Sequence, residues 1–533
     1  MVQIIVIVVY LCILATLGYL GYSKTKNTKD YYLGGRKIHP VVMALSYGAT
    51  FISTSAIVGF GGTAGVFGFS LLWLTFLNIF LGIFIAFIFF GKRTRRIGHN
   101  IQAHTFAEFL GKRYKSKFIQ RFTGVVIFLF MPIYAAAVMI GAAKFIETGL
   151  KIDYNIALFV FAIIVATYVF FGGIKSVMYS DAFQGTLMIV GMSILLVVVY
   201  WKLGGITAAH QQLTDLFKNS EVLEQTKGVQ AGGFQGWTSM PALFSKNWWT
   251  VISSIVMGVG IGVLAQPQLA VRFMTVKSDR DLNRAIPIGG VFIFLMTGVA
   301  FIIGALSNVF FFNDTGNISV VAAGNADSII PKFLDNFIPE WFLTVFLVVL
   351  LSAGMSTISS QFHAIGTAVG RDIIGIDDKN PKKAMLITRF GMLIAIAFTI
   401  LLSYELPNIW SDSIAISTAL FFGLCCAAFL PMYFGALYFK KLTKTAAISG
   451  MLAGFSSSLL WMMFVHTKES KAIKISNLLF GTDTVVGENS IWQFVDPIII
   501  ALSVSIIVTI IVQIASKKEL PKEHIDECFD GIK

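Results

Sequence analysis

Four hydroxyl side chains crowd into one strongly apolar stretch of this chain. Residues 341–362 contain no ionisable side chain, and the segment AGMSTISS (353–360) within them carries Ser356, Thr357, Ser359 and Ser360. Hydrocarbon offers a hydroxyl no hydrogen-bond partner, so these groups must face protein, water or a bound ligand. Closely packed neutral oxygens suit a small hard cation such as Na⁺. The segment is therefore a candidate cation site.

The composition is that of a polytopic all-α membrane protein. Of the 533 residues, 56% are hydrophobic and only 13% are charged, whereas a soluble domain carries about 25% charged residues. The first apolar run follows no basic segment and precedes no cleavage-site pattern, so we expect a retained helix. No nucleophile–base pair, metal-ligand cluster or phosphate-binding loop is present in the sequence. We expect no enzymatic activity.

Thirteen apolar runs are long enough to be transmembrane helices. They lie near 3–22, 40–66, 70–91, 119–148, 154–172, 180–201, 247–271, 286–312, 339–366, 384–403, 411–438, 445–466 and 493–515. An odd number of spans places the two termini on opposite sides of the membrane.

The basic residues predict the orientation. If the N-terminus is outside, 31 of the 41 Lys and Arg residues fall in the cytoplasmic loops and tail, as the positive-inside rule requires. The opposite loops 203–246, 313–338 and 467–492 are long but poor in basic residues. The net charge of +13 therefore reflects membrane topology and not binding to nucleic acid. We predict a multi-pass protein of the plasma (inner) membrane with a cytoplasmic C-terminus.

Two spans are poorly suited to regular helix. Residues 45–65 and 253–273 are rich in Gly, Ala and Ser, and Pro267 lies within the second. Interrupted helices at matching positions of two halves indicate a transporter's midplane site, although close helix packing through small residues remains an alternative. The two spans are five apart, which predicts two inverted five-helix repeats. The expected segments are a first helix and cytoplasmic loop (1–39), the first repeat (40–202), an extracellular loop (203–246), the second repeat (247–438), two C-terminal helices (439–516) and a cytoplasmic tail (517–533).

Three of the ionisable residues inside or at the ends of spans are candidates for a role in the site. Asp181 begins the sixth span and is expected either to pair with Lys175 at the interface or to stay ionised beside a bound cation. His363 is expected to be a packing residue more than a proton carrier. Arg272, which ends the seventh span, is expected to be a cytoplasmic anchor or a gate partner.

Five motifs in order carry a family resemblance. They are DYYLGGR (30–36), LSYGATFISTSAIVG (45–59), FGGIKSVMYSDAFQ (171–184), QPQLAVRFM (266–274) and AGMSTISSQF (353–362). Together they resemble the sodium/solute symporter family, which includes bacterial sodium/proline, sodium/galactose, sodium/sialate and pantothenate symporters. The resemblance covers residues 1–515 and implies the leucine-transporter (LeuT) fold with one extra helix before the first repeat.

The resemblance also implies two sodium sites, and hence two Na⁺ per cycle. The first takes Ala49 and Ile52 from the second span and Ala353, Ser356 and Thr357 from the ninth. The second, found in sialate-type members, takes Asp181, Ser356, Ser359 and Ser360. Residues 353, 356 and 357 share one helical face. For Ser359 and Ser360, hydrogen bonds back to carbonyls one turn earlier are the alternative.

The substrate positions implied by the resemblance are small, apolar or hydroxylated. They are Phe51, Thr54, Ser55, Ala56, Thr75, Asn78, Tyr134, Val259 and Val263. Of the side chains that mark proline-type members only Tyr134 is kept, and those that mark sugar-type members are replaced, so neither substrate is favoured. We expect a symporter that imports a monocarboxylate-type organic anion, with an amino acid or pantothenate as alternatives and a membrane sensor module as a less favoured one. Its partners would be Na⁺, this solute and the bilayer, with the monomer as the functional unit.

Overall fold

The computed structural model describes residues 2–23, 28–171, 173–375, 381–410, 412–487, 490–516 and 519–532. This part of the chain is built from helices and contains no β-strand; one isolated β-bridge joins Ile38 to Val276. Within the described residues, each predicted apolar run lies mostly on helix. The principal helices are α1 (Val2–Ser23), α3 (Pro40–Phe51), η2 (Ser55–Phe60), α4 (Gly61–Phe67), α5 (Leu72–Ile79), η4 (Phe80–Gly91), α8 (Lys117–Leu150), α9 (Tyr154–Phe171), α10 (Ile174–Lys202), η5 (Thr250–Val259), α15 (Gly260–Gly262), α16 (Pro267–Phe273), α17 (Asp279–Ile293), α18 (Val299–Thr315), α21 (Glu340–Thr367), α22 (Pro381–Ile409), α23 (Ser413–Tyr438), α24 (Lys444–Phe464) and α27 (Pro497–Ala515).

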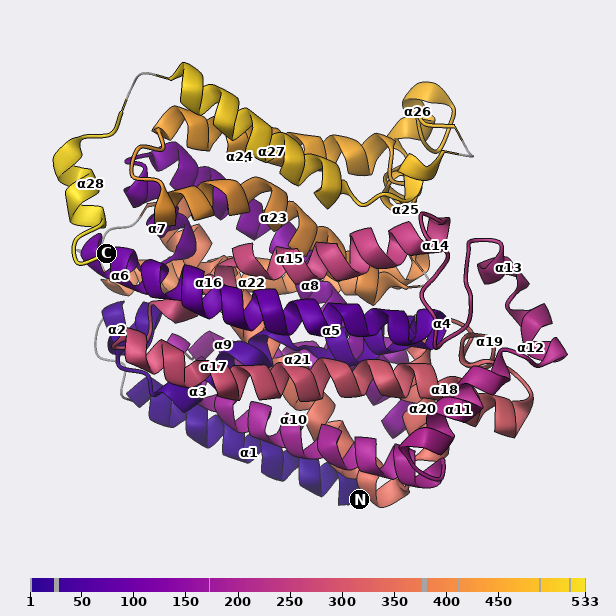
Figure 1. Ribbon diagram of the computed structural model, residues 1–533. Coiled ribbons are helices and arrows are strands. Elements are labelled where there is room, and N and C mark those ends of the chain that lie inside the picture. Colours follow the sequence, from indigo (N-terminus) through magenta and orange to yellow (C-terminus); the bar gives the residue numbers. More distant parts are fainter. Residues whose placement is uncertain are drawn as a thin grey trace.

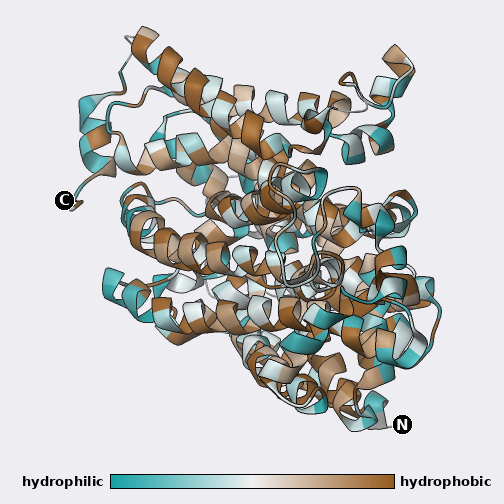
Figure 2. Ribbon diagram, turned by 45° about the vertical axis from the view of Figure 1, so that its right-hand side comes forward, coloured by the Kyte–Doolittle hydropathy of each residue, from teal (hydrophilic) through white to brown (hydrophobic). Residues whose placement is uncertain are grey.

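The helices have the lengths and compositions that a bilayer demands. Ten helices of the described chain are long and apolar enough to cross a membrane, and three shorter apolar helices accompany them. Since some of these segments run together without a break, the count of thirteen spans stays a prediction. Figure 2 shows hydrophobic residues along most of the helices and hydrophilic residues concentrated toward their ends.

The second span is interrupted, as its sequence predicts. Helix α3 ends at Phe51, Ile52 has an extended backbone (φ −92°, ψ 107°), and helix resumes at η2. The seventh span is interrupted at a different place from its glycines, which stay helical in η5 and α15. The break is at Gln266 (φ −76°, ψ 118°), because the following Pro267 disfavours helical backbone in the residue before it.

The helices run side by side as one bundle (Figure 1). Helix α10 packs against both α3 and α21, and α21 also packs on α8 and α3, so α3, α8 and α10 surround the hydroxyl segment of α21. The last two spans, α24 and α27, pair with each other beside α23. The extra helix α1 lies against α10 and α21.

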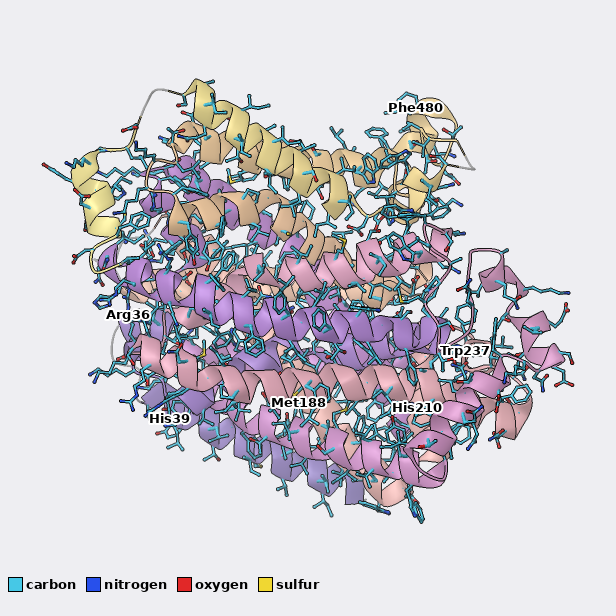
Figure 3. All side chains as sticks on the ribbon, viewed as in Figure 1. Arg36, His39, Met188, His210, Trp237 and Phe480 are labelled. Carbon is cyan, nitrogen blue, oxygen red and sulfur yellow. The ribbon has the colours of Figure 1, made fainter. Side chains whose placement is uncertain are left out.

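The two ends of the bundle carry different short helices. One end holds α11 (Ile206–Leu216), α12 (Ser220–Gln225), α13 (Lys227–Gln230), α25 (Thr467–Ile473) and α26 (Ile475–Phe480), and the other holds α6 (Lys92–Asn100), α7 (Phe106–Arg113) and α28 (Lys522–Cys528) (Figure 1). Figure 3 places Trp237 and Phe480 toward the first end and Arg36 toward the second. The indole Nε1 of Trp237 donates to the Gly65 carbonyl at 2.8 Å, so the long loop closes over α4 at the first end.

Candidate functional site

The hydroxyl segment of α21 meets the unwound end of α3. Ser356 Oγ donates to the Ala49 carbonyl at 2.8 Å, and Thr357 Oγ1 lies 3.2 Å from that carbonyl and 3.1 Å from the Thr50 carbonyl. Ser356 Oγ is also 3.2 Å from the carbonyl of Ala353. All of these residues are buried.

This cluster contains four of the five residues predicted for the first sodium site. The fifth, Ile52, is buried directly after the end of α3. Hydroxyl and carbonyl oxygens that otherwise bond to one another are neutral, do not titrate near neutral pH and match the ligand preference of a hard cation. The cluster can exchange these hydrogen bonds for a bound Na⁺.

A second polar cluster surrounds Asp181 on α10. Its Oδ2 accepts from Ser46 Oγ at 2.8 Å and from Thr50 Oγ1 at 3.3 Å, both on α3. Ser360 Oγ lies 3.0 Å from Thr50 Oγ1. One carboxylate and three hydroxyls from three helices thus converge. The sequence reasoning missed Ser46 and Thr50, although their i, i+4 spacing would place both on one face of α3.

The positive charge beside Asp181 is the guanidinium of Arg272. Arg272 Nη2 lies 3.0 Å from Asp181 Oδ2, 2.6 Å from Ser360 Oγ and 2.5 Å from Thr50 Oγ1, and Nε donates to Ser46 Oγ at 3.1 Å. Arg272 is 1% exposed. The expectation of a cytoplasmic anchor is wrong, because the guanidinium is buried against Asp181, while the alternative of a gate partner stays a prediction. Asp181 pairs with this side chain and not with Lys175.

The remaining residues predicted for the second sodium site lie on α21 and do not bond to Asp181. Ser359 Oγ and Ser360 Oγ both donate back to the Ser356 carbonyl, at 3.1 and 3.0 Å. Ser356 faces Ala49. Only Ser360 reaches the Asp181 cluster, through Arg272 and Thr50.

A small cavity, which we call the central cavity, lies beside the break in α3. It measures about 20 Å³, which is enough for about one water molecule. An organic solute can bind there only if the cavity expands. Six of the predicted substrate residues line it: Phe51, Ser55, Ala56, Asn78, Tyr134 and Val259.

Three predicted substrate residues do not line this cavity. Thr54 Oγ1 donates to the Val138 carbonyl at 2.5 Å, and Val263 packs near Gly82. Thr75 is buried near Gly298. The lining also includes Ile52, which was predicted for the first sodium site, and seven residues that the sequence reasoning did not select: Ser53, Phe60, Leu74, Thr297, Phe301, Thr418 and Phe422. Nothing in the sequence marks these seven, because they come from four separate spans.

The polar groups of this cavity are all uncharged. Ser55 Oγ and Thr418 Oγ1 lie 2.5 Å apart and hold η2 against α23. In the described part of the chain the Asn78 Oδ1 atom has no hydrogen-bond partner. Aromatic and aliphatic side chains, among them Phe51 and Phe422, supply most of the wall.

A second small cavity, of about 30 Å³, is lined in part by Arg272, Gln268, His363 and Asp372. The ring of His363 lies 5.4 Å from that of Tyr31, as a packing residue would, and its role stays a prediction. Arg272 thus contacts both this cavity and Asp181.

Comparison with known proteins agrees with this architecture. The profile described as "Sodium:solute symporter family" matches residues 31–454. The chain is 28% identical over 494 residues to sodium/proline symporter 2 of Staphylococcus saprophyticus, covering 91% of this chain and 89% of that protein. It is 27% identical to the sodium/pantothenate symporter of Haemophilus influenzae, covering 81% and 84%.

Among solved structures, a substrate-bound, outward-open Na⁺-coupled sialic acid symporter superimposes with a TM-score of 0.74 at 17% identity, covering 98% of this chain and 99% of that one. This likeness establishes the fold, which is the all-α LeuT-type architecture.

Proposed function

Because the chain belongs to the sodium:solute symporter family, we propose that it imports a monocarboxylate-type organic anion together with Na⁺, by alternating access. It is a sodium-coupled membrane transporter and not an enzyme. The end of the bundle with α11–α13, α25 and α26 faces outside in this proposal, as the distribution of basic residues favours. We call it the outer end.

One observation supports the coupling of Na⁺ binding to substrate binding. The unwound end of α3 borders both ligand positions: the Ala49 and Thr50 carbonyls accept from the α21 hydroxyls, while Phe51 and Ile52 line the central cavity. A Na⁺ that displaces those hydrogen bonds fixes the backbone that shapes the cavity. Each ligand then favours binding of the other, with a reciprocal free energy of about 1–3 kcal/mol.

The lining of the cavity supports the substrate class. A sugar has many hydroxyls, and each one buried without a partner costs about 1–3 kcal/mol, so this mostly apolar wall disfavours it. A small anion with an apolar body fits better, with its carboxylate near Asn78 and the Ser55–Thr418 pair. Bound Na⁺ supplies the neighbouring positive charge. Pantothenate is itself a monocarboxylate and stays an alternative, as do amino acids.

The number of sodium ions depends on Arg272. In this conformation its guanidinium takes the cation position of the Asp181 cluster. We propose that Na⁺ and Arg272 occupy that cluster alternately, so that a second Na⁺ enters only when Arg272 withdraws. The first site, which contains no protein cation, is the obligatory coupling site.

Uptake into proteoliposomes tests the function. An inward Na⁺ gradient is expected to drive accumulation of at least one compound from a panel of radiolabelled monocarboxylates, pantothenate and amino acids, and a K⁺ gradient is not. Uptake that follows a proton gradient and ignores Na⁺ would overturn the coupling. Accumulation of amino acids only would overturn the substrate class.

A further inference from the structure

Four lysines line one cavity at the outer end of the bundle. The cavity measures about 740 Å³, and Lys246, Lys468, Lys471 and Lys474 are part of its wall. A neighbouring cavity of about 700 Å³ shares Lys246 and Lys471. The walls come from α14 (Lys246–Trp249), α25, α26 and the ends of α22 and α23, and Figure 1 shows α14 beside α25.

This clustering contrasts with the scarcity of basic residues at the outer end. Only ten Lys and Arg residues lie outside the predicted cytoplasmic loops and tail, and four of them meet at this cavity. The ten are Lys144, Lys151, Lys202, Lys218, Lys227, Lys246, Lys332, Lys468, Lys471 and Lys474.

Carboxylates offset only part of this charge. Lys468 Nζ pairs with Asp412 at 2.7 Å, and Lys471 Nζ lies 3.6 Å from Asp483. Among the described residues, no carboxylate lies within ion-pair distance of Lys246 or Lys474. Lys246 Nζ instead lies 4.7 Å from the centre of the Phe494 ring. Asp412 is the one acidic residue in the described lining, and Glu469 and Asp327 also lie close enough to act on Lys468. The positive charge that no carboxylate pairs with is therefore that of Lys246 and Lys474.

The cavity also lies at the outer ends of helices that form the central cavity. The chain from Lys246 and Thr250 continues through η5 to Val259, and Asp412 and Ile416 precede Thr418 on the way into α23. The central cavity has no charged lining residue, and so nothing in its lining attracts an anion from a distance.

We propose that this outer cavity is an anion-binding vestibule that takes small carboxylates before they reach the central cavity. Ammonium groups donate charge-assisted hydrogen bonds to carboxylate oxygens, and clustered charge raises the local concentration of the opposite ion by about 10- to 1,000-fold. The binding of anions follows from the lysines alone, and only the identity of the anion as the transported solute rests on the proposed function.

The electrostatic part is tested without transport. Thr467 lines both outer cavities, so Thr467→Cys, in the full chain with its four native cysteines replaced, reports their potential. We compare the rates of modification by a sulfonate-bearing anionic and a trimethylammonium-bearing cationic methanethiosulfonate. The ratio of anionic to cationic rate is expected to fall at least about threefold in Lys246→Gln/Lys474→Gln, and acetate is expected to slow the anionic reagent.

A matched control removes equal charge from the same end of the molecule. Lys218 and Lys227 are exposed and pair with Asp215 and Glu224 within their own loop. Lys218→Gln/Lys227→Gln is expected to leave the ratio unchanged. An equal fall in this control, or no fall in Lys246→Gln/Lys474→Gln, would overturn the vestibule.

Transport then tests the link to the substrate. In Lys246→Gln/Lys474→Gln the KM for the transported monocarboxylate is expected to rise several-fold while kcat stays constant, and the difference from wild type is expected to shrink in 1 M salt, where the Debye length falls to about 3 Å. A changed reagent ratio with an unchanged KM would show an anion site off the transport route and overturn the delivery role. Failure of all Na⁺-driven uptake would instead overturn the proposed function and leave the reagent result standing.

Discussion

At the residue scale, the hydroxyls of α21 fall into two groups by their hydrogen bonds. Ser356 and Thr357 reach across to carbonyls of α3, whereas Ser359 bonds back to its own helix. Ser356→Ala removes a cross-helix oxygen, and a lost ligand contact costs about 1–3 kcal/mol. We expect the Na⁺ concentration for half-maximal uptake to rise about 5- to 150-fold.

Ser359→Ala is the matched control for this change, since it deletes a hydroxyl three residues along the same helix whose hydrogen bond goes to its own helix. Its Na⁺ requirement is expected to stay near that of the wild type. If Ser359→Ala proved as harmful as Ser356→Ala, the division between the two groups would be wrong and Ser359 would belong to a sodium site after all.

Arg272 carries the second prediction at this scale. Removing one partner of a buried ion pair leaves an uncompensated charge, which costs about 3–5 kcal/mol. In Arg272→Gln, Na⁺ becomes the cation available to Asp181, so the Tm of the detergent-solubilised variant is expected to be lower than that of wild type and to rise more steeply with NaCl than with choline chloride. The double variant Asp181→Asn/Arg272→Gln is expected to recover stability and lose the added Na⁺ dependence. A steep Na⁺ response that survives in the double variant would exclude the Asp181 cluster as the responsible site.

The sequence could identify the residue types of the cation sites but not all their contacts. The 353, 356, 357 spacing placed three residues on one face, and the contact of Ser356 and Thr357 with α3 agrees with it. The guanidinium at Asp181 could not be predicted in the same way. Its position depends on how far α16 turns inward after Gln266, and that direction is set by packing against other helices.

At the element scale, close packing is the use of glycine that the two interrupted spans share. A Cβ at Gly262 would lie 2.8 Å from the Phe422 carbonyl oxygen and from its Cβ, while a Cβ at Gly258 would meet only the Ser253 carbonyl oxygen at 3.5 Å. In the second span, a Cβ at Gly62 would overlap the Ala326 carbonyl oxygen. The breaks themselves lie at other residues. The periodicity of the sequence showed where helices lie but could not tell a glycine that packs against a neighbour from one that interrupts a helix.

Gly262→Ala and Gly258→Ala form a matched pair that tests this difference. Gly262→Ala is expected to destabilise the protein by about 1–3 kcal/mol through overpacking, and to reduce substrate affinity because Phe422 lines the central cavity. Gly258→Ala is expected to be neutral or slightly stabilising, since Ala favours helix by about 0.5–1 kcal/mol over Gly. Thermal unfolding in detergent and the KM of uptake measure the two effects. Equal behaviour of the two variants would contradict the packing argument.

At the scale of the whole molecule, the two buried cavities of about 20 and 30 Å³ are too small for an organic solute, so the proposed alternating access requires each end of the bundle to open in turn. One contact that closes the outer end lies between helix α20 (Ala326–Phe337) and the start of α23. Asp327 on α20 accepts from Ser413 Oγ at 2.8 Å and from the backbone N–H of Ile414 at 3.3 Å, at the start of α23. The same α23 carries Thr418 and Phe422 to the central cavity. Separation of α20 from α23 would expose Asp327 to water.

This closure makes outward opening sensitive to pH. Burial raises the pKa of Asp327 to about 7 in the closed state, the Ser413 hydrogen bond lowers it and the neighbouring Asp412 raises it further. An exposed aspartate has a pKa near 3.8, so between about pH 4 and pH 7 the closed state holds a proton that the open state releases. Rising pH through this window therefore favours opening, and the effect ends above about pH 7.

The initial rate of Na⁺-driven uptake is expected to increase from external pH 5.5 to 7 at constant internal pH. Asp327→Asn, which keeps the shape but cannot ionise, is expected to give a slower rate that varies little over the same range, whereas an unchanged pH profile in this variant would assign the titration to another group.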